Sequence, residues 1–417
     1  MKILIVNTYD IHGGAGRAAY RLHNALQSIG IESQMLVHSK TSDDPTVLVL
    51  QDPIYNSLRK YRQKLDTLPV DYYRKKTKNL FSPAWLPFSG IIPQINASDA
   101  DIVHLHWISG GMLRIEDISR IKKPIVWSLH DMWAFTGGCH YDCECGKYIL
   151  HCGACPVLGS KKRKDLSYRV FERKIKTFGK IPNLTVVGLS RWLEECAKNS
   201  VLFAKKSIVN LPNPIDTQAF KPLERHIARD LLDLPVDKKL VLFWADNSAG
   251  DSRKGFTELS DAIRQIKSEN VELVMFGSDH RINNLYMGFP THQLGYLPGD
   301  HLLRNVYSAA DVMVVPSLQE NLSNTIMESL SCGTPVVSFY IGGNSDLIEH
   351  QTNGFLAKPF DTADLAEGID WVLNHPASQE LSKNARQSVM ENFEAIHVAR
   401  QYQDLYKMVL EDKDQKQ

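Results

Sequence analysis

The 417-residue sequence is informative first for what it lacks. No apolar run reaches the roughly 18–20 residues that span a bilayer. The opening stretch MKILIVNTYD has too short an apolar run for a signal peptide and no small-residue cleavage site, so we expect a cytoplasmic protein. The formal net charge is only +1, which argues against nucleic-acid binding through bulk charge. Neither G-x-S-x-G nor G-x-x-x-x-G-K-[ST] occurs, so hydrolase and P-loop functions have no motif to support them.

What is present is sufficient for two folded domains. The composition, 43% hydrophobic and 23% charged, is that of a globular protein and excludes disordered and fibrous classes. Short apolar runs alternate with helical patterns, and the alternation restarts near residue 240 after a proline-containing linker at residues 210–220. This pattern predicts an α/β protein with two doubly wound, Rossmann-like domains facing across a cleft. The predicted boundaries are 1–212, 213–393 and a final helix at 394–417.

The most informative stretch is PSLQENLSNTIMESLSCGTP, residues 316–335. It follows Asp311–Val315, an apolar run that predicts a buried parallel strand. A helical pattern begins at Asn324, so Glu320 is expected in the strand-to-helix loop and Glu328 in the first turns of the helix. Because a helix N-terminus attracts anions, two acids beside it suit a ligand with phosphate and hydroxyl groups, such as a nucleotide sugar. The alternative is two solvated surface acids.

The Glu–seven–Glu spacing, followed by CGTPVVSFYIGGNSDLI and NGFL, resembles the donor-binding half of a retaining GT-B glycosyltransferase of family 4. The resemblance covers nearly the whole chain; it is strong from about residue 240 to 373 and weak from 51 to 97. It implies a bacterial exopolysaccharide or colanic-acid-type enzyme whose final helix crosses back to the first domain. The implied reaction moves a hexose from a nucleotide-diphosphate sugar, UDP-glucose-type first and GDP-mannose second, to a saccharide or lipid-linked acceptor.

The resemblance also implies how the site works. Glu328 would accept hydrogen bonds from ribose hydroxyls, Glu320 would hold sugar hydroxyls, and the backbone at Tyr296 would meet the base. No cofactor, catalytic metal or side-chain nucleophile is expected; Asp99 and Asp101 match an Asp-x-Asp string, but they precede a core strand in the first domain. The expected catalytic residues are Glu320, His130, Lys254 and Arg253. The expected donor-binding residues are Gly13, Gly14, Arg253, Lys254, Tyr296, Glu320, Asn321, Leu322, Ser323 and Glu328.

Arg253 and Lys254 lie between a predicted strand end and a helix predicted to run to about residue 267. A departing diphosphate gains charge in the transition state, so cations that bind it more tightly there lower the barrier. Many family members place an arginine several residues earlier, where this chain has none within 245–252, so Lys254 carries the stronger expectation. The chain reads ENLS where the family usually reads E-G-F-G, which predicts a differently shaped sugar pocket. An exposed Arg-Lys pair on a solvated surface is the alternative.

A glycine-rich loop with Gly13 and Gly14 is predicted ahead of a helix from about Arg17. Its letters match the dinucleotide fingerprint G-x-G-x-x-A, but the loop is predicted to be too long, and His38 and Ser39 stand where that fingerprint needs an acid. We therefore expect the loop's backbone N–H groups to approach a diphosphate or the acceptor. A non-catalytic nucleotide-sugar-binding protein and an NAD-dependent sugar-nucleotide dehydrogenase remain the rival functions.

His130 follows a predicted strand at residues 124–129 and should face the ligand crevice at the carboxyl edge of the sheet. The resemblance implies that it contacts the donor sugar. His104 and His106 lie along the preceding strand, and a structural role is favoured for both.

Two further clusters have open interpretations. Basic segments at residues 57–78 and 161–180 are either solvated helix faces or a surface that adheres to anionic lipid at the inner face of the plasma membrane. Five of the seven cysteines lie within Cys139–Cys155. Cys152 and Cys155 have metal-ligand spacing, but the other spacings are irregular, so structural zinc, disulfides and free thiols are all alternatives.

Overall fold

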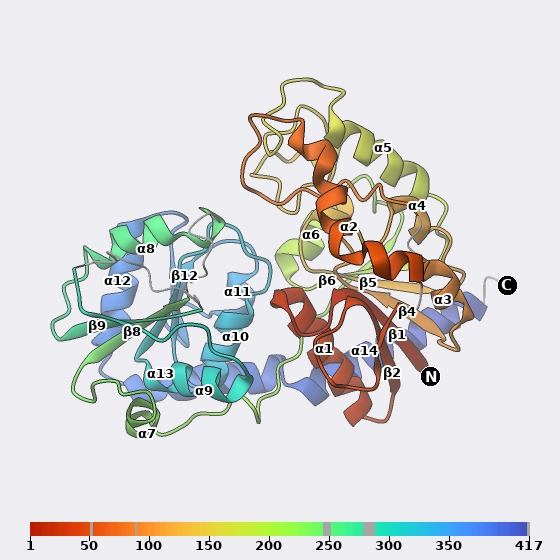
Figure 1. Ribbon diagram of the computed structural model, residues 1–417. Coiled ribbons are helices and arrows are strands. Elements are labelled where there is room, and N and C mark those ends of the chain that lie inside the picture. The colour runs from red at the N-terminus through yellow and green to blue at the C-terminus, as the bar shows by residue number, and fades with distance from the viewer. Residues whose placement is uncertain (51–52, 88–89, 245–251, 278–287, 415–417) are drawn as a thin grey trace. The chain divides into compact units, whose positions relative to one another are not determined.

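The computed structural model describes residues 1–50, 53–87, 90–244, 252–277 and 288–414, and it describes side chains of the second helix from residue 61 onward (Figure 1). Their contacts divide the chain into two compact units. Unit 1 comprises Met1–Pro214 with Ala395–Gln417, and unit 2 comprises Ile215–Glu394.

Unit 1 is built on a parallel sheet with strand order β3-β2-β1-β4-β5-β6-β7. Its strands are β1 (Lys2–Tyr9), β2 (Glu32–Ser39), β3 (Val47–Val49), β4 (Ile102–Leu105), β5 (Ile125–Leu129), β6 (Leu184–Gly188) and β7 (Ser207–Asn210). Its α-helices are α1 (Gly13–Ser28), α2 (Pro53–Asp71), α3 (Ile91–Ala97), α4 (Ile115–Ile118), α5 (Leu166–Phe178), α6 (Arg191–Asn199) and α14 (Ala395–Asp414). Alternate residues of β1 enter two different core clusters, Leu4 and Val6 in one and Ile3 and Ile5 in the other, so both sheet faces are covered.

The final helix, α14, belongs to the core of unit 1. Its Val398, Tyr402 and Tyr406 are fully buried in the same cluster as Ile3 and Ile5 of β1. Figure 1 shows this blue helix entering a unit whose other elements come from the first half of the chain. Unit 1 is therefore assembled from two segments that lie far apart in the sequence.

Unit 2 repeats the design with strand order β10-β9-β8-β11-β12-β13, again parallel throughout the described residues. Its strands are β8 (Lys239–Trp244), β9 (Val271–Phe276), β10 (Thr291–Gln293), β11 (Val312–Val315), β12 (Val336–Phe339) and β13 (Gly354–Ala357). Its α-helices are α7 (Arg225–Asp230), α8 (Phe256–Ile263), α9 (Asp300–Ala309), α10 (Asn324–Ser331), α11 (Asn344–Leu347), α12 (Thr362–Leu373) and α13 (Ser378–Asn392). The strand order reverses between β8 and β11, the position at which doubly wound sheets bind ligands.

Three predicted elements differ from the structure. The helix expected from Arg17 begins at Gly13, because β1 continues to Tyr9 and shortens the loop. The helix expected from Arg253 to residue 267 is α8, which ends at Ile263 in a tight turn. The sequence at residues 294–296 predicts a further short strand, but the structure has this strand, β10, three residues earlier.

No helix within the described ranges combines the length and apolarity needed to cross a bilayer.

Candidate functional site

Unit 2 places Lys254 and Glu320 side by side. Lys254 Nζ lies 2.9 Å from Glu320 Oε2, and the two side chains are 38% and 13% exposed. The same Nζ lies 5.7 Å from the ring centroid of Trp244, the last residue of β8. The ammonium group is thus held by a carboxylate and an aromatic face while much of the lysine remains open to a ligand.

A close backbone contact fixes the lysine loop against the loop that follows β11. Gly255 has a φ of +68°, and a Cβ there would lie 1.8 Å from the carbonyl oxygen of Pro316. The Leu318 N–H donates to the carbonyl oxygen of Arg253 over 2.6 Å. Only glycine permits this approach, so residue 255 brings Lys254 to the loop that carries Glu320.

A second turn holds the backbone of Glu320 from the other side. Gly342 has a φ of +50°, and a Cβ there would lie 1.9 Å from the Glu320 carbonyl oxygen. The Gly343 N–H donates to the same oxygen over 3.3 Å. Glu320 therefore lies in the strand-to-helix loop, as predicted, and two glycine turns restrict its position.

Helix α10 begins directly after this loop. Ser323 is its N-cap in extended conformation, but the serine side chain makes no capping hydrogen bond and instead lies 2.9 Å from Thr325 Oγ1. The side chains of Asn321, Leu322 and Ser323 are buried. The partial positive charge of this helix N-terminus lies next to the loop that carries Glu320.

Glu328 lies in α10, as predicted, and is only 1% exposed. The Tyr307 hydroxyl of α9 donates to Glu328 Oε2 over 2.9 Å. Sequence reasoning missed Tyr307, whose pattern on α9 indicates only a buried apolar face. Ribose binding by Glu328 stays a prediction.

The remaining expected donor residues of unit 2 lie on turns. Arg253 is half-buried in the 3-10 turn Ser252–Lys254, and Tyr296 is 58% exposed after Gly295, which accepts a hydrogen bond from the Gly277 N–H. Residues 245–251, where the family places an arginine, lie outside the described residues.

In unit 1, His130 follows β5 and is half-buried. Its Nε2 lies 2.9 Å from Nδ1 of His106. Burial lowers the pKa of His130 to about 4, against the opposing effect of Asp131, so the imidazole is neutral near pH 7.

His106 determines which nitrogen of His130 carries the proton. Among the described residues, His106 Nε2 has no hydrogen-bond partner although it is buried. A buried acceptor without a partner costs less than a buried N–H without one, so the His106 proton belongs on Nδ1 and is donated to His130 Nε2. Neutral His130 then carries its own proton on Nδ1. His106 is therefore a positioning residue, whereas His104 is held structurally by Tyr406 and Ser128 at 2.7 and 2.8 Å.

The segment after His130 is tied down by a polar network. Asp131 accepts a hydrogen bond from Trp107 Nε1 at 2.9 Å and lies 2.6 Å from His140 Nδ1. His140 Nε2 in turn lies 2.9 Å from Ser82 Oγ. Burial alone would raise the pKa of Asp131, but the neighbouring His140 and the hydrogen bonds to the carboxylate lower it, so that the pKa lies below its usual value.

Gly13 and Gly14 lie in the first turn of α1 and not in a long loop, which corrects the prediction. The argument that the loop is too long for a dinucleotide fingerprint is therefore wrong. The second argument against that fingerprint holds, because β2 has no acidic residue at its end. Asp10, at the end of β1, is buried and accepts hydrogen bonds from the N–H groups of Thr41 and Ser42 at 2.9 and 2.7 Å.

The Asp-x-Asp string has a structural partner away from the strand ends that carry the site. Asp99 lies 2.7 Å from Lys2 Nζ, and Asp101 accepts the Lys2 N–H over 2.7 Å, at the beginning of β1. Within the described ranges no group of three or more His, Cys, Asp or Glu side chains is arranged so that it could hold a metal ion.

The basic segments are only partly available as a surface. Arg62 is 4% exposed and donates to the carbonyl oxygen of Gly111, and Lys174 is fully buried. The sequence predicts a solvated or lipid-binding surface for both segments, which is wrong for these two residues because carbonyl groups of unit 1 hold their side chains inside. The side chains of Arg59 and Lys60 lie outside the described residues.

The architecture of two parallel α/β sheets, one in each unit, is that of the GT-B class. Sucrose-phosphate synthase from Thermosynechococcus elongatus has a TM-score of 0.70 and 20% identity, over 99% of this chain and 100% of that one. Anabaena HepE in complex with UDP and glucose has a TM-score of 0.66 and 16% identity, over 98% and 99% of the two chains. These likenesses confirm the predicted fold class.

Sequence comparison adds the family. Residues 238–375 match the family described as "Glycosyl transferases group 1". An uncharacterized glycosyltransferase of Methanocaldococcus jannaschii is 31% identical over 335 residues, which cover 74% of this chain and 83% of that relative. The chain belongs to the group 1 glycosyltransferases.

Proposed function

We propose that the protein is a retaining, family 4 hexosyltransferase of polysaccharide biosynthesis that uses a nucleotide-diphosphate sugar, without a metal or cofactor in catalysis. The observation that carries the proposal is the Lys254–Glu320 pair at 2.9 Å, held beside the N-terminus of α10. The ammonium group and the helix N-terminus suit a departing diphosphate, and the carboxylate suits sugar hydroxyls. UDP-glucose is the first donor to test, because HepE was solved with UDP and glucose; GDP-mannose is the second.

On unit 1, His130 would contact the donor sugar, and the first turn of α1 with Gly13 and Gly14 would offer backbone N–H groups to a diphosphate or the acceptor. The neutral state of His130 suits an uncharged partner. Both roles come from the family resemblance and stay proposals.

A thermal-shift screen of UDP, GDP, ADP and their sugars tests donor binding, because a ligand that binds only the folded state raises the melting temperature. Turnover then separates the rivals. UDP release from UDP-glucose without NAD consumption supports the transferase, and binding without release supports a non-catalytic sensor. NAD reduction would indicate a dehydrogenase, which the missing acid at residues 38 and 39 disfavours. An NMR spectrum of the product should show that the transferred sugar keeps the anomeric configuration it had in the donor.

We further propose that the acceptor is lipid-linked and that unit 1 adheres to the anionic inner face of the plasma membrane. The first basic segment contacts the chain just before the second: the Thr77 N–H donates to the Val157 carbonyl oxygen over 2.9 Å, and a Cβ at Gly159 would lie 2.2 Å from the Lys75 carbonyl oxygen. Tyr72, 84% exposed, adds an aromatic group to the first segment. The exposed basic residues of these segments, among those whose side chains are described, are Lys64, Arg74, Lys75, Lys76, Lys78, Lys161, Lys162, Arg163, Lys164, Arg169, Lys176 and Lys180.

Vesicle sedimentation at low salt tests this surface. Each basic residue near an anionic membrane contributes about 1 kcal/mol, so serine at Lys161, Lys162 and Lys164 together should release most of the bound protein. Lys267→Ser, an exposed lysine of unit 2, is the matched control. Equal binding to neutral and anionic vesicles, or none to either, would remove the proposal.

A further inference from the structure

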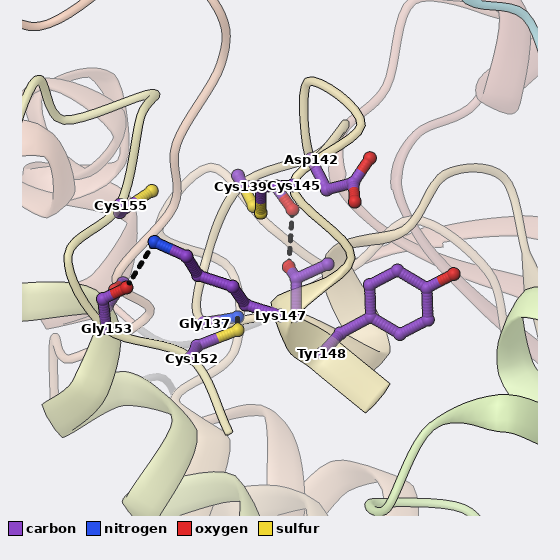
Figure 2. A pocket seen from close by; sticks show the side chains of 11 residues that line it. Gly137, Cys139, Asp142, Cys145, Lys147, Tyr148, Cys152, Gly153 and Cys155 are labelled. Atoms are coloured by element: carbon purple, nitrogen blue, oxygen red, sulfur yellow. Dashed lines mark hydrogen bonds between the residues drawn. The ribbon is translucent and has the colours of Figure 1, made fainter. Parts of the chain in front are cut away.

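Four cysteines of unit 1 line one small cavity. Figure 2 shows the side chains of Cys139, Cys145, Cys152 and Cys155 around it. Cys145 and Lys147 are only half-buried, so solvent reaches the cavity past them. The cavity has room for a molecule about the size of water. A small solute can therefore meet sulfur here, and the surroundings of each sulfur decide how it reacts.

Cys139 and Cys155 form a pair within this lining. Their thiols are hydrogen-bonded to each other. Both side chains are buried in one small apolar cluster with Phe81, Val157 and Leu158. Sulfur atoms at hydrogen-bonding separation are already neighbours, and a disulfide only shortens the distance between them to about 2.05 Å.

Cys155 is the reactive member of the pair. Its sulfur accepts hydrogen bonds from the Cys139 thiol and from the backbone N–H groups of Leu158 and Val157. These donors favour the thiolate, so the pKa of Cys155 lies below its usual value although burial opposes the shift. The same hydrogen bond, together with burial, raises the pKa of Cys139, which keeps its proton. The pair thus combines a thiolate, the nucleophilic form of cysteine, with a neighbouring thiol.

The other cysteines of the segment provide the contrast. Burial raises the pKa of Cys152 to about 12, although the Gly137 N–H donates to its sulfur over 3.1 Å. Burial also raises the pKa of Cys145. Cys143 is exposed and lies outside the cavity lining. Of the four lining cysteines, Cys155 is therefore the one whose surroundings favour reaction with an electrophile.

The backbone on both sides of the pair is held in place. Cys139 pairs with Phe81 in an isolated antiparallel bridge. The Cys155 N–H donates to Asp165 Oδ2 over 2.8 Å, and Asp165 is the N-cap of α5. The two sulfur atoms are thus brought together by segments that are anchored separately, and a bond between them would close residues 139–155 into a loop.

We propose that Cys139 and Cys155 are a reversible redox site, at which hydrogen peroxide converts the two thiols into a disulfide. The Cys155 thiolate attacks one peroxide oxygen, the O–O bond breaks, and the departing hydroxide takes up a proton to become water. The Cys139 sulfur then attacks the sulfenic acid at Cys155, and the thiol proton leaves with the hydroxyl group as a second water. The two sulfurs lose two electrons, which the peroxide gains. A dithiol reductant restores both thiols by exchange.

The disulfide would also affect the strand ends of unit 1. His140 follows Cys139 directly and lies 2.6 Å from Asp131, the neighbour of His130. A covalent bond at Cys139 therefore changes the restraint on the network beside His130. This consequence for transfer rests on the proposed function, whereas formation of the disulfide does not depend on it.

The first experiment treats the reduced full chain with a small molar excess of hydrogen peroxide. Remaining thiols are then alkylated, and the bonds are mapped by peptide mass spectrometry without reduction. We expect a Cys139–Cys155 cross-linked peptide as the main product, which disappears after dithiothreitol is added. A different cysteine pair as the main product, sulfinic acid at Cys155 without a disulfide, or no oxidation of Cys155 would overturn the proposal.

Variants separate the two roles. Cys139→Ser removes the thiol that resolves the sulfenic acid, so dimedone should label Cys155 in this variant and leave it almost unlabelled in the wild type. The exposed control, Cys143→Ser, should form the same disulfide as the wild type. Equal dimedone labelling of Cys155 in wild type and Cys139→Ser would contradict the role of Cys139. If Cys139→Ser does not fold, the bond map of the wild type still decides.

Discussion

The two units share one scaffold but place different chemistry at their strand ends. Each has a parallel sheet whose strand order reverses beside its first strand, between β1 and β4 in unit 1 and between β8 and β11 in unit 2. At these ends unit 1 presents neutral imidazoles, His106 and His130, whereas unit 2 presents the charged pair Lys254 and Glu320. The scaffold thus sets where a ligand site forms, and a few strand-end residues set whether it suits a hydroxyl or a phosphate.

The units also differ in how they hold their loops. At the strand ends that carry the candidate site residues, unit 2 holds its loops by close backbone contacts at Gly255 and Gly342, while unit 1 holds them by side-chain networks around Asp131 and Asp10. Backbone contacts tolerate no added atom, whereas side-chain networks depend on protonation. Substitution and acid should therefore affect the two units differently.

The largest effect is expected from a methyl group at Gly255. Gly255→Ala should lower the free energy of unfolding of unit 2 by at least about 3 kcal/mol, because the Cβ would meet the Pro316 carbonyl oxygen at 1.8 Å. Gly13→Ala in unit 1 has a similar φ of +71° but nothing within 4 Å of its Cβ, so it should cost only about 1–2 kcal/mol. Urea unfolding measures both. Equal losses of stability in the two variants would show that the positive φ, and not the contact with Pro316, determines the cost.

The second-largest effect is expected from acid, which should destabilise unit 1. Burial lowers the pKa of His23 to about 4 and that of His104 to about 3, below the unfolded value of about 6.5. Between pH 6.5 and 4 the unfolded chain binds protons that the folded chain does not, so stability is full above pH 6.5 and falls on acidification. At pH 5 we expect about 2 kcal/mol from each histidine.

Hydrogen exchange followed by peptide mass spectrometry at pH 7.5 and 5 reads the two units separately. Exchange protection, corrected for intrinsic rates, should fall more in unit 1, and His104→Gln should weaken the pH dependence. If the exchange protection of unit 1 depends on pH equally strongly in His104→Gln and in the wild type, His104 does not contribute to the acid sensitivity.

Removing either member of the charged pair should affect catalysis and not folding. Lys254→Ala and Glu320→Ala should each lower turnover at least tenfold, or about 1.4 kcal/mol, because each group is expected on the donor. Since the two groups interact at 2.9 Å, the double variant should lose less than the product of the single effects. Lys267→Ala and Glu380→Ala, exposed residues of the same unit, are the controls. A near-normal rate in either site variant would argue against that residue.

The smallest effect compares two tyrosine hydroxyls. Tyr307→Phe removes the hydrogen bond to Glu328 Oε2, and Tyr406→Phe removes the one to His104 Nδ1. Each should cost about 1 kcal/mol of stability. Only Tyr307→Phe should change the KM for the donor, because Glu328 is the expected ribose ligand. An equal KM change in both would contradict a role for Glu328 in donor binding.

Apolar runs predicted most of the core elements. The apolar run at residues 271–276 predicts a strand and the pattern at 300–309 predicts a helix, and β9 and α9 have these same bounds. The predicted linker at residues 210–220 overlaps the end of β7, and this strand was not predicted. Its side chains are half-buried or exposed, so its sequence lacks the apolar run that marks a buried strand. The sequence shows which residues are charged but not which of them are buried. Arg62 is an example, because its hydrogen-bond partners are backbone carbonyl groups, which no sequence pattern reveals.

The candidate site was predictable in its residues but not in its geometry. The loop position of Glu320 followed from the apolar run before it and the helical pattern after it. The contact between Gly255 and Pro316 joins segments about 60 residues apart, and no local pattern encodes it. The His106–His130 contact depends on the parallel register of β4 and β5, which only the folded sheet defines.

The split composition of unit 1 affects how the chain is made. A ribosome releases residues 1–214 first and then synthesises all of Ile215–Glu394 before α14 emerges. At roughly 5–20 residues per second, that interval lasts on the order of 10–40 s. Throughout it, the apolar surface that Val398, Tyr402 and Tyr406 later cover stays open on the nascent chain. Unit 2 is continuous in the sequence, so of the two units it should be the first to complete its core.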